Sequence, residues 1–170
     1  MMAYVALLRA VNVGGTGKLP MSELVAMCEG LGFSSVKTYI ASGNVVFSTR
    51  AREGTVKAKL EEALHNYAGK PVGVMVRTAA EMAAALAHNP FPNAAPNRTL
   101  AIFLDAPPPD DTLDTLSGRK NEEVALGVRE VYVNYGDGMG TSKLKIPAAK
   151  TGTARNMNTI AKLAAMAAAI

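Results

Sequence analysis

Two groups of polar residues in this sequence have the composition of an anion-binding site. The first group lies in three separate segments and consists of Asn12, Gly14, Gly15, Lys18, Ser42, Gly43, Asn44 and Lys70. Glycines let several backbone N–H groups point the same way, and such concave nests bind anions. Lysines bring positive charge to the same segments. Turns also require glycine, asparagine and serine, so a purely structural role is the competing interpretation.

The second group lies ahead of the alanine-rich C-terminal segment and consists of Lys143, Lys145, Lys150, Thr153, Arg155 and Asn156. We predict a helix over residues 156–170, which places Arg155 at its start. A cation there opposes the helix dipole, so this arginine is a candidate for holding an anion or a carboxylate. Thr153 or Asn156 can instead act as the N-cap of the helix without any further role.

Arg9 is a third candidate because it falls inside an apolar run. An unpaired charge buried in a strand is strongly unfavourable. Arg9 therefore either lies at the exposed end of the strand or is paired internally, with Glu23, Asp105 or a backbone carbonyl group as its partner.

Other site chemistries find little support. The segment Gly14–Lys18 lacks the P-loop pattern, because Asn12 stands at the first glycine position and Leu19 follows the lysine. A dinucleotide fingerprint fails as well. Cys28 is the only cysteine and the two histidines lie far apart in the sequence, so we expect no disulfide, no metal site and no cofactor. No histidine is expected near Ser42, which leaves catalysis without a candidate mechanism and the question of an enzyme open.

Bulk composition indicates one globular, soluble protein. The chain has 170 residues, 49% of them hydrophobic, and a net charge of +4. The first residues lack the basic leader of a signal peptide, and no run approaches the ~20 apolar residues of a membrane span. We therefore expect a cytoplasmic protein with no membrane partner. Its basic residues are scattered along the sequence, which favours a solvated surface over a nucleic-acid footprint.

Apolar periodicity predicts strand, helix, strand, strand, helix and strand in the first half. These elements are expected at 3–11, 20–32, 36–40, 45–47, 56–67 and 72–76. Thr78 and Glu81 then form a capping-box pattern that opens a further helix. The second half is expected to hold strands at 100–104 and within 123–135, a short helix at 107–116, and a glycine-rich loop at 136–150.

The fold class that this order predicts is α+β, with two ferredoxin-like βαββαβ halves packed together. Residues 89–98 contain three prolines and three asparagines and form the best internal boundary. We expect an N-terminal half at 1–88, a linker at 89–98 and a C-terminal half with the terminal helix at 99–170. In this topology the loops after the first strand, the second strand and the second helix share one end of the sheet, so the first polar group should gather there.

Three segments resemble a bacterial family catalogued only as a domain of unknown function. They are Ala6–Gly15 with Lys18–Met21, Thr38–Phe47, and Thr153–Asn156 with Thr159. The resemblance implies a duplicated ferredoxin-like fold and no particular activity. The polar positions that recur in the family correspond to Arg9, Asn12, Ser42, Asn44, Arg155 and Asn156. Met157 stands where the family often has tryptophan, which implies a weaker contact if that ring stacks on a ligand.

These observations together favour a protein that binds a small anionic ligand, either a nucleotide or another phosphorylated molecule. RNA is the weaker form of this hypothesis, because neither central strand of the first half offers two adjacent aromatic residues on one face for base stacking. The alternative is an oligomer-forming or partner-binding protein that uses its open sheet edges. The sequence leaves the oligomeric state open.

Overall fold

The structure is a computed structural model and describes residues 1–9 and 18–170. The chain forms two compact units. The N-terminal unit is Met1–Met82 with Leu163–Ile170, and the C-terminal unit is Ala83–Lys162. Each unit contains one four-stranded antiparallel sheet, so the fold is α+β with two related halves.

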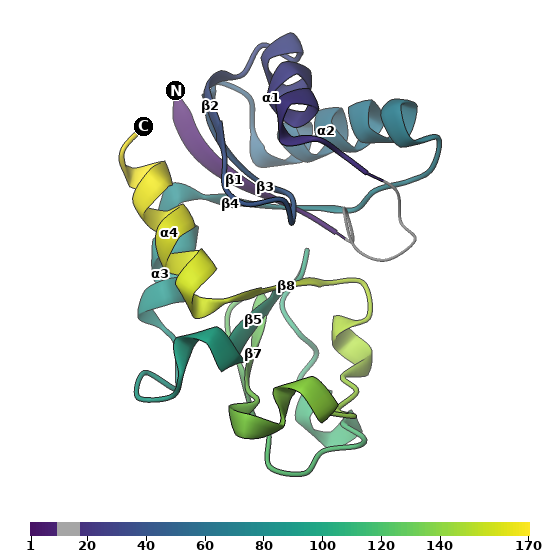
Figure 1. Cartoon of the computed structure of the whole chain (residues 1–170), viewed down its shortest axis with the longest axis vertical. Helices are drawn as coiled ribbons and strands as arrows, with labels where there is room; N and C mark the ends of the chain where they lie inside the picture. The colour runs from purple at the N-terminus through teal and green to yellow at the C-terminus, as the bar shows by residue number, and fades with distance from the viewer. Residues whose placement is uncertain (10–17) are drawn as a thin grey trace. The chain divides into compact units, whose positions relative to one another are not determined.

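The N-terminal unit follows the predicted order of six elements. They are β1 (Met2–Leu8), α1 (Met21–Gly30), β2 (Ser34–Thr38), β3 (Asn44–Thr49), α2 (Glu53–Ala68) and β4 (Val74–Thr78). The strand order β2-β3-β1-β4, with antiparallel neighbours throughout, is the ferredoxin-like arrangement. Helices α1 and α2 cover the same face of this sheet (Figure 1).

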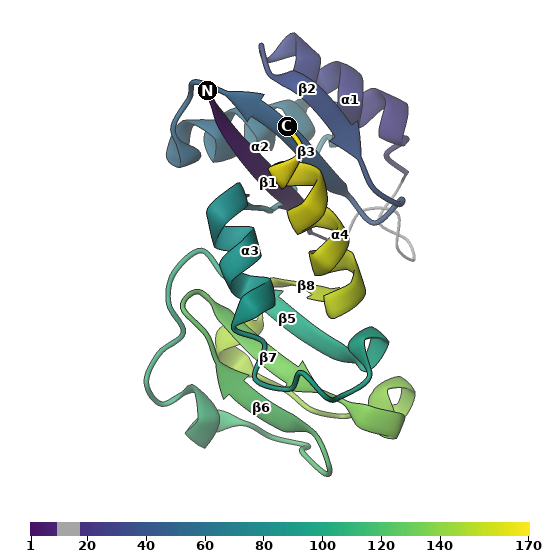
Figure 2. The same ribbon diagram turned by 90° about the vertical axis from the view of Figure 1, so that its left-hand side faces the viewer.

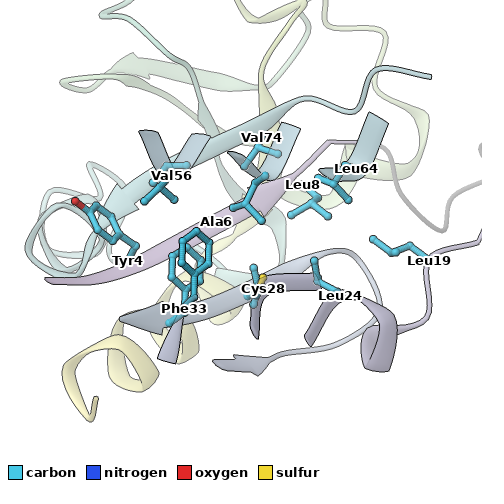
Figure 3. Close-up of a cluster of buried hydrophobic side chains, with 14 residues drawn as sticks. Tyr4, Ala6, Leu8, Leu19, Leu24, Cys28, Phe33, Val56, Leu64 and Val74 are labelled. Carbon is cyan, nitrogen blue, oxygen red and sulfur yellow. The ribbon is translucent and has the colours of Figure 1, made fainter. Parts of the chain in front are cut away.

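One hydrophobic core lies between this sheet and its two helices. Tyr4, Ala6 and Leu8 alternate along β1 and face the core, as the two-residue period of a strand requires. Figure 3 shows Tyr4 at one end of the core and Leu8, Leu19 and Leu64 at the other. Full burial of each leucine side chain stabilises the fold by about 1.5–3 kcal/mol.

The C-terminal unit repeats the strand order with shorter crossovers. Its elements before the last helix are η1 (Pro96–Arg98), β5 (Thr99–Phe103), η2 (Thr112–Thr115), β6 (Glu123–Leu126), β7 (Glu130–Asn134), η3 (Gly136–Thr141), η4 (Pro147–Ala149) and β8 (Thr153–Asn156). The second sheet has the order β6-β7-β5-β8 (Figure 2), which corresponds strand by strand to the order β2-β3-β1-β4 of the first sheet. The helix expected at 107–116 is only the 3-10 turn η2. Pro107, Pro108 and Pro109 have no N–H to donate, so regular structure begins after them.

Strand β8 corrects the sequence prediction around Arg155. The terminal helix begins at Met157, and the four residues before it pair with β5, with Arg155 opposite Ala101. Arg155 therefore lies inside a strand and not in the first turn of the helix. The strand was not predicted because a Thr-Ala-Arg-Asn segment carries no apolar run.

The two remaining helices, each directly after the last strand of a sheet, are α3 (Ala79–Ala87) and α4 (Met157–Ala168). The predicted capping box is confirmed: the Glu81 N–H donates to Thr78 Oγ1 at 3.1 Å, and the Thr78 N–H donates to Glu81 Oε1 at 2.9 Å. Asn156 caps α4, because its Oδ1 accepts the Thr159 N–H at 2.9 Å. No helix in the described part of the chain is long and apolar enough to cross a membrane.

The burial of Cys28 leads to a prediction about its reactivity. Burial, with a smaller contribution from Glu29, raises the pKa of the Cys28 thiol to about 12. Because the thiolate is the reactive form, we expect the folded protein not to react with Ellman's reagent at about pH 8. Complete reaction in concentrated guanidinium chloride is the control. Rapid reaction of the folded protein would contradict the packing of α1 described above.

Candidate functional site

Three segments of the N-terminal unit meet where β1 ends. The Leu8 N–H donates to Gly43 O at 2.8 Å, and the Arg9 N–H donates to Gly73 O at 2.9 Å. The turn between β2 and β3 and the loop between α2 and β4 are thus both bonded to the same end of β1, as the order of the elements predicts. We call this place the strand-end site. Its described residues are Arg9, Lys18, 39–44 and 69–73.

Lys18 is brought to the strand-end site by its neighbour in the sequence. Leu19 is buried in the core together with Leu8 and Leu64 (Figure 3), at the end of the core where β1 finishes. Lys18 itself is exposed. Three members of the first polar group lie outside the described residues: Asn12, Gly14 and Gly15.

The turn of the strand-end site is held from inside by Asn44. Its side chain is fully buried, and Nδ2 donates to Tyr39 O at 2.9 Å and to Ser42 Oγ at 3.0 Å. The Tyr39 N–H in turn donates to Asn44 O at 3.0 Å. Gly43 has a φ of +88°, which favours glycine at the point where the turn bonds to β1. The polar residues of this turn therefore fix its shape.

The loop before β4 is fixed by a pair of side chains from α2. Glu61 Oε2 accepts the Val74 N–H at 3.2 Å, and Lys57 Nζ donates to Val74 O. Lys57 and Glu61 also form an ion pair at 3.2 Å. The side chains of Lys57 and Glu61 thus satisfy backbone groups on the outer edge of β4, which has no neighbouring strand.

The exposed charges of the strand-end site have one sign. Arg9, Lys18 and Lys70 are all exposed, so Arg9 lies at the exposed end of its strand. Its side chain lies beside Gly73, where an added Cβ would be 3.6 Å from the Arg9 Cβ. The described residues of the site include no aspartate or glutamate. Among all the residues that the structure describes, no group of three or more histidine, cysteine, aspartate or glutamate side chains is placed to hold a metal ion.

The C-terminal polar group is divided by the second sheet. Leu144 packs against the hydrophobic core on one face of that sheet, so its neighbour Lys143 also lies on this face. Tyr132 on β7 and Ala101 on β5 are register partners whose side chains face away from this core. Arg155 pairs with Ala101 and shares that opposite face. Lys143 and Arg155 therefore do not belong to one cluster.

Arg155 has the setting of a structural arginine. Its Nη1 donates to Thr153 Oγ1 at 2.8 Å and to Ala154 O at 2.9 Å, and burial lowers its pKa to about 10. The first sheet carries an arginine at the equivalent position of its last strand. Arg77 is also buried, and its Nη1 donates to Val76 O at 3.0 Å. The two halves thus share a buried arginine one residue before the cap of a helix.

The structure also brings together cations that the sequence analysis missed. Ser117 and Lys145 form an antiparallel bridge, which places Arg119 and Lys120 next to the segment that holds Lys143. No sequence pattern marks this contact, because it joins two irregular segments that lie far apart in the chain.

The fold and site can now be compared with known proteins. The family described as "Protein of unknown function (DUF1697)" matches residues 1–132, which include β1 to β6 and part of β7. The chain belongs to this family. Within the DUF1697 match lie the whole strand-end site and the first two of the three segments on which the resemblance was based. The Thr153–Asn156 segment lies beyond it.

One solved structure shows the same fold over the whole chain. Conserved bacterial protein SP0830 from Streptococcus pneumoniae aligns with a TM-score of 0.81 at 24% identity, and the alignment covers 98% of each chain. At this identity the similarity supports the fold of this DUF1697 protein alone. None of the curated proteins matches the chain.

Ile40 leads to a prediction about the turn of the strand-end site. It has a φ of +51° and is 53% exposed. A β-branched residue in the left-handed region is strained by about 1–3 kcal/mol. We expect Ile40→Asn to increase the free energy of unfolding by about 1 kcal/mol, because asparagine adopts this conformation readily. Urea unfolding measures the change.

The matched control is Ile40→Val, which keeps the β-branch and should leave the stability within about 0.5 kcal/mol of the wild type. Equal stability of the asparagine and valine variants would show that Ile40 is not strained.

Proposed function

We propose that the protein binds a small anionic ligand, a nucleotide or another phosphorylated molecule, at the strand-end site. The observation that carries the proposal is the pair of backbone hydrogen bonds that hold the turn and the loop against the end of β1. These bonds hold the segments of Arg9 and Lys70 at one strand end, and the burial of Leu19 in the core beside Leu8 brings the exposed Lys18 to the same end. The described residues of the site include no carboxylate.

A phosphate group suits the donors that these residues offer. Arg9 provides a planar guanidinium that can bind two oxygens at once, whereas Lys18 and Lys70 provide compact charges. Each exposed ion pair contributes only about 0–1 kcal/mol. Several cations must therefore act on one multiply charged group, and the affinity should fall as salt screens them over about 8–10 Å.

Asn44 and Gly43 support the site rather than contact the ligand in this proposal. The buried amide of Asn44 is bonded to the turn, and Gly43 directs its carbonyl group to β1. Ser42 lies on the same turn and accepts a hydrogen bond from Asn44. A turn fixed in this way loses little conformational entropy on binding, which favours affinity.

Binding is better supported than catalysis. The described residues of the strand-end site contain neither an imidazole nor a carboxyl group, the groups that most often transfer protons near neutral pH. The thiol of Cys28 lies in the core. We propose the cytoplasm as the compartment, because a single reduced cysteine is typical there.

The test is a thermal-shift screen against nucleotides, sugar phosphates and inorganic phosphate, followed by titration calorimetry on any compound that stabilises the protein. A ligand at a hundredfold excess over its dissociation constant stabilises the fold by about 2.7 kcal/mol. We expect Arg9→Gln and Lys70→Gln each to weaken binding about threefold, a change of about 0.7 kcal/mol.

Lys59→Gln is the matched control, since Lys59 is an exposed lysine on α2 of the same unit. It removes the same charge away from the strand-end site and should leave the affinity unchanged. A screen without any hit, or an equal loss of affinity in Lys59→Gln and Arg9→Gln, would rule out the proposed site.

A further inference from the structure

The C-terminal unit carries a second group of cations, built on a different principle. Four exposed basic residues lie on two segments that are joined side by side. We call them the basic patch: Arg119, Lys120, Lys143 and Lys145.

The two segments of the basic patch are held together by their backbones. The Ser117 N–H donates to Lys145 O at 3.1 Å, and the Lys145 N–H donates to Ser117 O at 2.8 Å. Gly118 has a φ of +69°, and a Cβ at this position would lie 2.0 Å from the carbonyl oxygen of Lys143. Only glycine fits this contact. The close approach of the two segments is thus specified by the sequence.

The one carboxylate inside the patch is engaged in holding it together. Glu122 is buried, and it accepts hydrogen bonds from the Lys120 N–H at 2.6 Å and from the Ser142 hydroxyl. These bonds, that from Ser142 above all, lower the pKa of Glu122. Arg119 Nε donates to Glu122 O at 2.7 Å. Glu122 therefore ties both segments together below the exposed cations.

The lysines of the patch point outward. Leu144 and Ile146 pack against the core of this unit, so Lys143 and Lys145, which alternate with them, are exposed. Apart from Glu122, the nearest acidic residues along the chain are Asp114, Glu123 and Asp137. Glu123 accepts a hydrogen bond from Asn134, and Asp137 forms an ion pair with Arg98.

We propose that the basic patch binds the phosphodiester backbone of a nucleic acid. Protein interfaces are anchored by aromatic and large apolar side chains and are depleted in lysine. Residues 117–122 and 142–146 present four exposed cations and no exposed aromatic or large aliphatic side chain. A phosphate backbone is bound by cations alone, without base contacts, so the interaction is insensitive to sequence and sensitive to salt. The proposal is independent of the strand-end site.

The test measures fluorescence anisotropy of a labelled single strand of about 20 nucleotides, and of the matching duplex, between about 50 and 200 mM salt. We expect the wild type to bind with a negative slope of log K against log salt. Replacing two lysines, in the double variant Lys143→Gln and Lys145→Gln, should reduce the slope by about 1.4 for the single strand or about 1.8 for the duplex. The arm with the tighter binding identifies the strandedness of the partner.

Two further variants distinguish binding by the patch from general attraction by the net charge of the protein. Lys37→Gln with Lys59→Gln removes two exposed lysines from the N-terminal unit and should leave affinity and slope unchanged. Gly118→Ala keeps every charge but forces the two segments apart, so it should weaken binding at constant net charge; circular dichroism checks its folding.

Three outcomes would overturn the proposal. The first is that the wild type binds neither nucleic acid at about 50 mM salt. The second is an equal loss of affinity in the two double-lysine variants. The third is binding of polyglutamate without binding of nucleic acid. The last result would assign the patch to an acidic protein instead.

Discussion

The register of β1 is the constraint on which the rest of the N-terminal unit depends. This strand is paired on both sides and buried on both faces, since Val5 and Leu7 are as inaccessible as the side chains that face the helices. A slip of one residue would turn every one of these side chains to the other face. The alignment with Leu7 opposite Asn44 and Leu8 opposite Val74 is therefore fixed. The end of β1, and with it the position of the turn, the loop and their cations, follows from core packing.

Comparison of the two sheets explains why the strand-end site belongs to the first. At the corresponding end of β5 the Leu104 N–H donates to Arg129 O at 2.9 Å, so the backbone geometry is repeated. The charges are not. Asp105 stands where the first sheet has Arg9, and Arg129 Nη1 donates to the carbonyl oxygen of Asp105 at 3.2 Å. The carboxylate of Asp105 repels an anion at the end of β5, whereas the cations at the end of β1 attract one. The proposed anion site therefore depends on charges at the end of β1 that the end of β5 does not repeat.

The sequence predicts the features that depend on local pattern. Buried strands and amphipathic helices give the N-terminal unit a clear periodicity, and the capping box of Thr78 and Glu81 spans only one helical turn. Strand β8 has no such signal, because its four residues are held in place by pairing with β5 far back in the chain. Topology also predicts that the loop after the first strand, the turn after the second strand and the loop after the second helix share one end of the sheet. That Asn44 is buried and shapes the turn depends on packing in three dimensions, which no residue pattern shows.

The two cationic surfaces differ in how their charges are arranged, and this difference sets the ligand that each one suits. Around the end of β1, three separate segments each contribute one exposed cation, and we propose that this arrangement suits a compact group of high charge such as a single phosphate. In the basic patch, two extended segments spread their cations along a bridge, which suits a polymer because each neutralised phosphate adds its own counterion release. A small anion would engage only part of the patch, and a polymer cannot concentrate its charge at the strand end. The net charge of +4 indicates only that anions are attracted. The two proposals rest instead on where strand register and the Ser117–Lys145 bridge place the cations.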